Sequence, residues 1–196
     1  MVTDIITISS TGANMDLALN QTTRVAEYKG LSPKNALHLR LLAEEMMGMM
    51  RAITHETSGK FWIEDSDGVY QLHLLVETII DEGMRRKLLA ASSTGENEAS
   101  RGLMGKLREF FFRNANNDIA AYDSPLAQAG NVPNMTDWEW SLTRYQRNLY
   151  TAKRKQPEAA EAWDELEKSV VNNVADDVKV SIKGWNTEMT IIKKLN

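Results

Sequence analysis

Asn35–Ile53 reads NALHLRLLAEEMMGMMRAI, and this stretch predicts a long helix against which the rest of the chain packs. At 100° per residue its large apolar side chains fall on one arc, the pattern of a core-facing stripe. Glu45 lies at the border of this stripe, whereas Glu44 points away from it. A carboxylate at such a border can face a pocket, so Glu45 is a candidate functional residue, although ordinary helix surface is the simpler interpretation. The stripe consists of Leu39, Leu42, Met46, Met49, Met50 and Ile53.

The segments before this helix predict a strand and a second helix. Asp4–Ser10 is a short run rich in β-branched residues and is typical of a strand. Asn14 then stands at the position of a helix cap, ahead of an amphipathic pattern over Met15–Tyr28. The Ser-Pro pair at 32–33 favours a new helix start, so the central helix follows at once.

A hairpin is the clearest signal after the central helix. Lys60–Glu64 and Val69–Ile80 flank the turn-forming residues 65–68, Asp-Ser-Asp-Gly. Alternate residues of the second arm are apolar, so that face is expected to meet the core. His73 lies on the opposite face, where we expect an exposed sheet histidine rather than a ligand.

The second half of the chain predicts a loop, a helical pair and a closing hairpin. The polar stretch Ser92–Ser100 is expected to be a mobile loop. One amphipathic helix is predicted over Trp138–Lys153 and another from Pro157, and their short joint favours an antiparallel pair. Alternation in Val178–Lys183 and Glu188–Lys194 predicts the hairpin. The apolar stripes of the helical pair comprise Trp138, Leu142, Tyr145 and Leu149, then Trp163, Leu166, Val170 and Val174.

Composition excludes several classes of function. The 196 residues carry a net charge of −4 with scattered Lys and Arg, which does not favour nucleic acid as a partner. The chain has no Cys, so disulfides, thiol catalysis and Cys-based zinc sites are excluded. Its three histidines, His38, His55 and His73, show no metal-site spacing. Neither a signal peptide nor a membrane span is predicted, so a cytoplasmic location is expected.

The order of these elements resembles the GHKL (Bergerat-fold, histidine-kinase-like) ATP-binding domains, most closely the small anti-sigma-factor serine kinases. The likeness covers Asp4–Phe112 and resumes at Val178–Lys194. It implies an α+β fold, a two-layer α/β sandwich whose mixed, mostly antiparallel sheet has helices on one face. It also implies a single domain over residues 1–196, in which 113–177 is a mainly helical insertion carrying the helical hairpin.

The resemblance assigns roles on the central helix. In this family a glutamate orients the attacking hydroxyl or water, and an asparagine four residues later holds magnesium. Glu45 aligns with the glutamate and is the implied catalytic residue, while the asparagine position falls on Met49. Aligning Glu44 instead places it on Gly48. Neither residue binds a hard cation, since a thioether is soft and glycine offers no side chain. No metal ligand is therefore expected.

The family's adenine-binding Asp-x-Gly motif and its glycine-bearing lid are both present in altered form. Strand parity places the aspartate at Thr78, although Asp81 and Gly83 spell the motif if a bulge shifts the parity. The lid is matched around Gly95 and ends at Gly102, where backbone N–H groups at a helix start suit phosphate. The implied nucleotide-site positions are Met49, Thr78, Asp81, Gly83, Thr94, Gly95, Arg101 and Gly102.

These altered motifs leave three functions open. The first is a non-catalytic regulatory protein, resembling anti-sigma factors, that binds a sigma-factor-like or other protein partner and needs neither ATP nor magnesium. The second is a working ATP-binding protein, an ATP-dependent serine kinase that uses magnesium. The third is an assembly module whose helical pair joins copies, for instance in a homodimer. The missing magnesium ligand favours the first.

Overall fold

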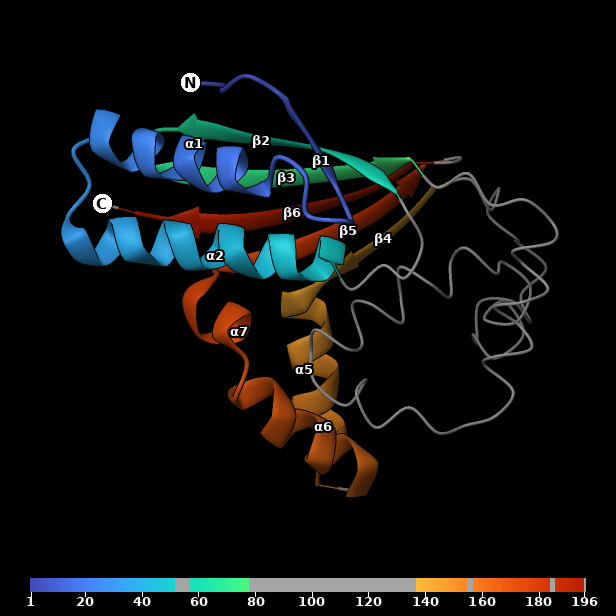
Figure 1. The fold of residues 1–196 in the computed structure, drawn as a ribbon. Coiled ribbons are helices and arrows are strands. Elements are labelled where there is room, and N and C mark those ends of the chain that lie inside the picture. The colour runs from blue at the N-terminus through green and yellow to red at the C-terminus, as the bar shows by residue number, and fades with distance from the viewer. Residues whose placement is uncertain (52–56, 78–136, 155–156, 184–185, 196) are drawn as a thin grey trace, which may run out of the picture.

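The computed structural model describes residues 1–51, 57–77, 137–154, 157–183 and 186–195, which form an α+β structure (Figure 1). The described helices all lie in the sequence regions where helices are predicted. The strands are β1 (Ile6–Ser9), β2 (Ser58–Ser66), β3 (Val69–Glu77), β4 (Asp137–Ser141), β5 (Asp177–Lys183) and β6 (Asn186–Lys194). The helices are α1 (Met15–Tyr28), α2 (Pro33–Arg51), α5 (Leu142–Ala152), α6 (Pro157–Glu167) and α7 (Val170–Val174).

The sheet joins the two predicted hairpins side by side. Its strand order is β1-β2-β3-β6-β5-β4, so β3 of the first hairpin pairs with β6 of the last, for example Leu72 opposite Ile191. The resemblance implies a mixed sheet, but every pairing between the described strands is antiparallel. Both hairpins are confirmed, and their pairing brings distant parts of the sequence together at the sheet centre.

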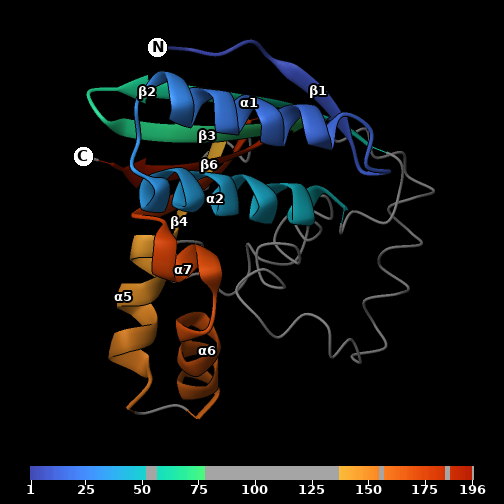
Figure 2. The same ribbon diagram turned by 60° about the vertical axis from the view of Figure 1, so that its left-hand side comes forward.

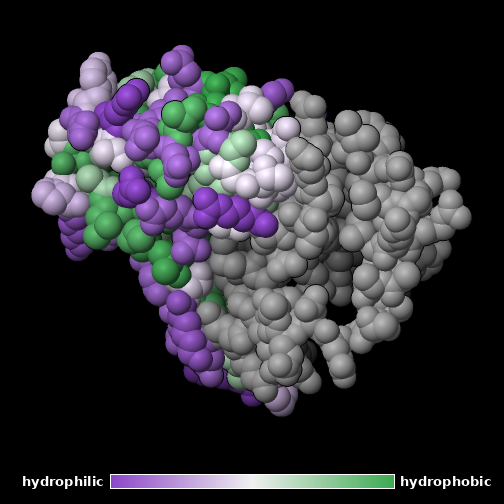
Figure 3. All heavy atoms as spheres, in the orientation of Figure 1, coloured by the Kyte–Doolittle hydropathy of each residue, from purple (hydrophilic) through white to green (hydrophobic). Residues whose placement is uncertain are grey.

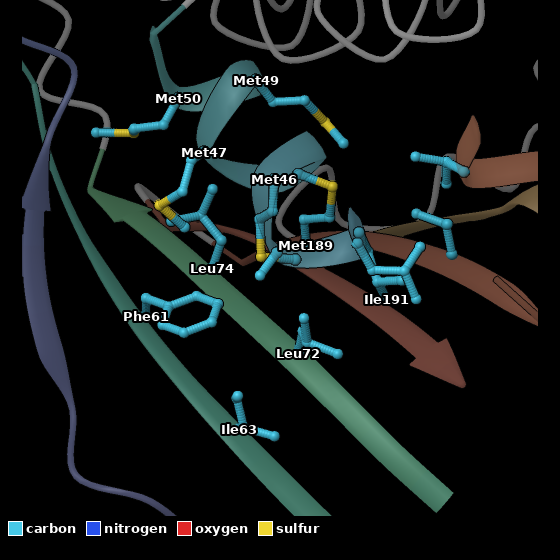
Figure 4. Close-up of a cluster of buried hydrophobic side chains, with 14 of the residues drawn as sticks. Met46, Met47, Met49, Met50, Phe61, Ile63, Leu72, Leu74, Met189 and Ile191 are labelled. Atoms are coloured by element: carbon cyan, nitrogen blue, oxygen red, sulfur yellow. The ribbon is translucent and has the colours of Figure 1, made fainter. Parts of the chain in front are cut away.

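Helices α1 and α2 lie next to each other on one face of the sheet (Figures 1 and 2). The predicted stripe of α2 is confirmed for the described residues, because its large apolar side chains are buried against the sheet (Figure 4). Flexible thioethers suit this contact, since they fill irregular gaps between a helix and a twisted sheet. The cluster includes Met46, Met47, Met49, Met50, Phe61, Ile63, Leu72, Leu74, Met189 and Ile191.

The predicted helical pair exists, but two of its boundaries are wrong. Trp138 lies in β4 rather than in a helix, because residues 137–141 pair with β5 and α5 begins only after Ser141. The Ser141 side chain accepts a hydrogen bond from the Arg144 backbone N–H, which is a helix-capping contact. Ser169 caps α7 in the same way, so the predicted second helix is broken into α6 and α7.

Helices α5 and α6 project from the sheet and its covering helices, while α7 contacts α2 (Figures 1 and 2). The Tyr150 and Trp163 rings meet edge to face at 5.7 Å between centroids, and Lys153 Nζ lies 4.0 Å from the Trp163 centroid. Polar residues predominate along the edge of this projection that Figure 3 leaves uncovered. The pair is thus held together partly by aromatic and cation–π contacts.

A charged cluster fastens the chain termini to the turn between β2 and β3. Lys29 Nζ lies 2.5 Å from the buried Asp65 carboxylate, whose other oxygen accepts the Gly68 N–H. The Met1 ammonium donates to the Asp65 carbonyl oxygen, and the Leu195 N–H donates to that of Gly68. A Cβ at Gly68 would lie 2.7 Å from the Leu195 carbonyl oxygen, and φ there is 80°, so glycine is required.

We predict that Asp65→Asn destabilises the protein at neutral pH and that this effect fades in acid. The Lys29 ammonium lowers the pKa of Asp65, so ionised Asp65 stabilises the folded state. This contribution is complete above the unfolded carboxyl pKa of about 4 and is lost as pH falls through the lower folded value. Urea unfolding of both proteins at a series of pH values measures the difference.

Asp67→Asn is the matched control, because Asp67 is exposed in the same turn and its left-handed backbone, with φ of 51°, accepts asparagine. It should leave the pH dependence unchanged. An Asp65→Asn difference that stays constant from neutral to strongly acidic pH would contradict the prediction.

Candidate functional site

The structure places two of the sequence-predicted site residues, Glu45 and Met49, one turn apart on α2. The remaining predicted positions, at 78, 81, 83, 94, 95, 101 and 102, lie outside the described residues, as does the predicted loop over 92–100. The two described positions therefore define the candidate site, at the C-terminal half of α2.

Met49 is a core residue rather than a ligand. Its exposed fraction is 7%, and it belongs to the buried cluster that α2 makes with the sheet. Gly48, the alternative position, is exposed, and a Cβ built on it would meet nothing within 4 Å. Neither side chain supplies an oxygen for a hard cation. More broadly, no group of three or more His, Cys, Asp or Glu among the described residues is placed to hold a metal ion.

Glu45 is half-buried at the border of the stripe, as predicted. Burial raises the pKa of its carboxyl group, and the nearby Glu44 carboxylate raises it further. Glu44 itself is exposed and pairs with Arg40, with 3.0 Å between Oε1 and Nε. A carboxyl whose pKa is shifted toward neutrality is a better proton acceptor than an ordinary surface glutamate. Burial and the neighbouring Glu44 carboxylate thus single out Glu45 among the glutamates of α2.

A second polar cluster, which sequence reasoning did not identify, lies on the other face of the sheet. The expectation that His73 is exposed is wrong, since its exposed fraction is 8%. The His73 ring stacks on Trp62 and its Nδ1 lies 2.9 Å from Glu188 Oε1. The cluster joins β3 to its two neighbours, β2 and β6. The signal that could reveal it is the cross-strand register, which sequence spacing alone does not provide.

We predict that Glu45→Gln raises the melting temperature at pH 7. A raised pKa in the folded state means that the ionised carboxylate is less stable there than in the unfolded chain. The destabilisation by ionised Glu45 decreases as pH falls through the folded pKa. The gain in melting temperature from Glu45→Gln should therefore vanish near about pH 4. Thermal unfolding at the two pH values measures it. Glu44→Gln is the comparison, and it should give a smaller gain, because it removes only the lesser cause of the Glu45 shift and also loses the pair with Arg40. A gain equal to that of Glu45→Gln would contradict the assignment.

Comparisons with known proteins identify no relative of this chain. No family model matches the chain, and neither a curated protein nor a solved structure matches it. Within the described residues, no helix combines the length and the apolar character that crossing a bilayer requires.

Proposed function

We propose that this chain is a non-catalytic regulatory protein, built on a histidine-kinase-like ATPase scaffold, that acts by binding another protein. The observation that carries this proposal is the burial of Met49 in the core at the position where the resemblance expects the magnesium ligand. The α+β arrangement, with α1 and α2 on one face of an antiparallel sheet, is compatible with that scaffold.

Loss of the metal ligand weakens nucleotide binding more than loss of a single contact would. A triphosphate brings several negative charges, and in this family magnesium neutralises much of that charge. In place of an asparagine oxygen, α2 presents the thioether of Met49 to the core. The carboxylates on α2 that precede Met49 in the sequence, Glu44 and Glu45, would repel phosphate in the absence of the metal.

The projecting helices α5 and α6 offer a surface for the protein partner. Tyr150 is 54% exposed, and Val170 at the start of α7 is also exposed. Arg144 and Arg147 are exposed on α5, whose eleven residues include no acidic side chain. This combination of an exposed aromatic and exposed arginines is enriched in protein interfaces, and it suits a partner with an acidic surface.

A second function, an ATP-dependent serine kinase, is favoured by one observation, the raised pKa of the half-buried Glu45. Perturbed carboxyl groups gather at catalytic sites, although structural burial produces them as well. The kinase would need a metal ligand from residues other than Met49. Nucleotide binding therefore separates the two functions.

We predict that ATP binds with a dissociation constant above roughly 0.1 mM, which corresponds to less than about 5.5 kcal/mol, and that magnesium does not tighten it. The reason is the absence of an oxygen ligand at Met49. Isothermal titration calorimetry of the full chain with ATP, with and without magnesium, measures this. Magnesium-dependent binding in the micromolar range would overturn the regulatory proposal in favour of the kinase. Loss of turnover with ATP binding retained in Glu45→Ala would then identify Glu45 as catalytic.

We predict that Tyr150→Ala weakens capture of the protein partner from an extract of the native cells by at least about tenfold, as expected for an aromatic anchor at an interface. Tyr28→Ala is the matched control, because Tyr28 is 79% exposed at the end of α1, away from the projection. Equal capture by both variants would contradict a docking role for α5.

Sedimentation tests the assembly function, since a dimer that Tyr150→Ala makes monomeric would assign the projection to self-association instead.

A further inference from the structure

The sheet face opposite α1 and α2 carries an ordered row of side chains. The register places Trp62 opposite His73 and His73 opposite Thr190, and Thr190 in turn opposite Lys179. These residues belong to four successive strands, β2, β3, β6 and β5. Their side chains point away from the methionine cluster, because neighbouring residues of a strand alternate between the two faces. The row therefore lies apart from the candidate site on α2.

His73 is held rigidly at the centre of this row. Its ring stacks on the Trp62 ring at 4.6 Å between centroids, with 4° between the planes. Its Nδ1 lies 2.9 Å from Glu188 Oε1 and 3.3 Å from Thr190 Oγ1. The Glu188 carboxylate accepts a hydrogen bond from Nδ1–H, and in the neutral imidazole this tautomer has a lone pair on Nε2.

The free Nε2 of His73 lies near another hydrogen-bond acceptor, the Glu64 carboxylate. Among the described residues it has no hydrogen-bond partner, although it is buried. Glu64 Oε1 lies 4.0 Å away and accepts the Trp62 indole N–H at 3.0 Å. A gap of 4.0 Å is too long for a direct hydrogen bond, and a cation or a donor placed between the two acceptors would satisfy both.

We propose that His73 Nε2 and the Glu64 carboxylate bind a divalent cation of the zinc class, with Glu188 as the positioning residue. A histidine that donates its other ring N–H to a carboxylate is the usual arrangement of metal-bound imidazole. Imidazole nitrogen selects zinc, copper or nickel over magnesium, so this site is chemically distinct from the magnesium site of an ATPase. The proposal does not depend on the regulatory function.

The distances allow such a cation. The midpoint of the Nε2–Oε1 gap is 2.0 Å from each atom, close to zinc–nitrogen and zinc–oxygen bonds of about 2.0–2.1 Å. Tetrahedral geometry needs a gap of about 3.3 Å, so Glu64 must move by about 0.7 Å. The Glu64 side chain is 41% exposed and can make this shift, and solvent water can complete the coordination. With two protein ligands the site is a low-affinity one, in keeping with the absence of any larger metal-binding group among the described residues.

The test is calorimetric titration of the full chain with zinc chloride alone. We expect one site that Glu64→Gln weakens at least about tenfold, because the variant keeps an acceptor for Trp62 but loses the charge. Glu188→Gln should weaken it about tenfold through the imidazole, as measured for carboxylates behind metal-bound histidines. His73→Gln should abolish it. His38→Gln is the matched control and should bind zinc like the wild type, since His38 lies on α2 beyond the opposite face of the sheet.

A second readout reports on the site directly and guards against misfolded variants. Copper(II) bound at Nε2 should quench the fluorescence of the stacked Trp62, and Trp62→Phe, which keeps an aromatic platform, should remove that quenching while zinc still binds. Zinc binding that survives both His73→Gln and Glu64→Gln would overturn the proposal. So would the absence of zinc binding by folded wild-type protein, which would mean that water alone bridges Nε2 and Glu64.

Discussion

The packing of the apolar stripe of α2 onto the centre of the sheet is the contact on which the rest of the structure depends. It buries Met46, Met47 and Met50 against residues of the β2–β3 hairpin and of β6, a strand that lies far from that hairpin in the sequence. The free energy of such burial is proportional to the apolar area removed from water, so a long helix over three strands contributes a large share. This packing also requires the first hairpin to pair with the last one, through β3 and β6.

The same packing limits what α2 can do chemically. Side chains that point into the core, Met49 among them, are unavailable to a ligand, and those that point outward, such as Glu44, meet solvent and Arg40. Only the border of the stripe remains, where Glu45 is desolvated without being fully buried. The raised pKa of Glu45 is thus a consequence of helix amphipathicity, and it supports a catalytic role no more strongly than a structural one.

The sheet separates two chemically different environments. On the helix-covered face, Phe61 and Leu72 belong to the buried apolar cluster. On the other face, the buried His73 stacks on the Trp62 ring and contacts the Glu188 carboxylate. Because strand residues alternate between faces, a change to one network need not disturb the other. Any cation-binding property of the His73 face can therefore be altered independently of the α2 border.

The sequence by itself determined the elements whose signals are local: α1, the described part of α2 and both hairpins follow from periodicity and turn residues. It also determined the border position of Glu45, since helical geometry depends only on spacing. The tertiary structure alone decided that residues 137–141 pair as β4, because a Trp-Glu-Trp run fits a strand as well as a helix until β5 offers hydrogen bonds. It likewise decided the burial of His73, since the partners of His73 come from β2 and β6, and cross-strand register is a long-range property that no local pattern encodes.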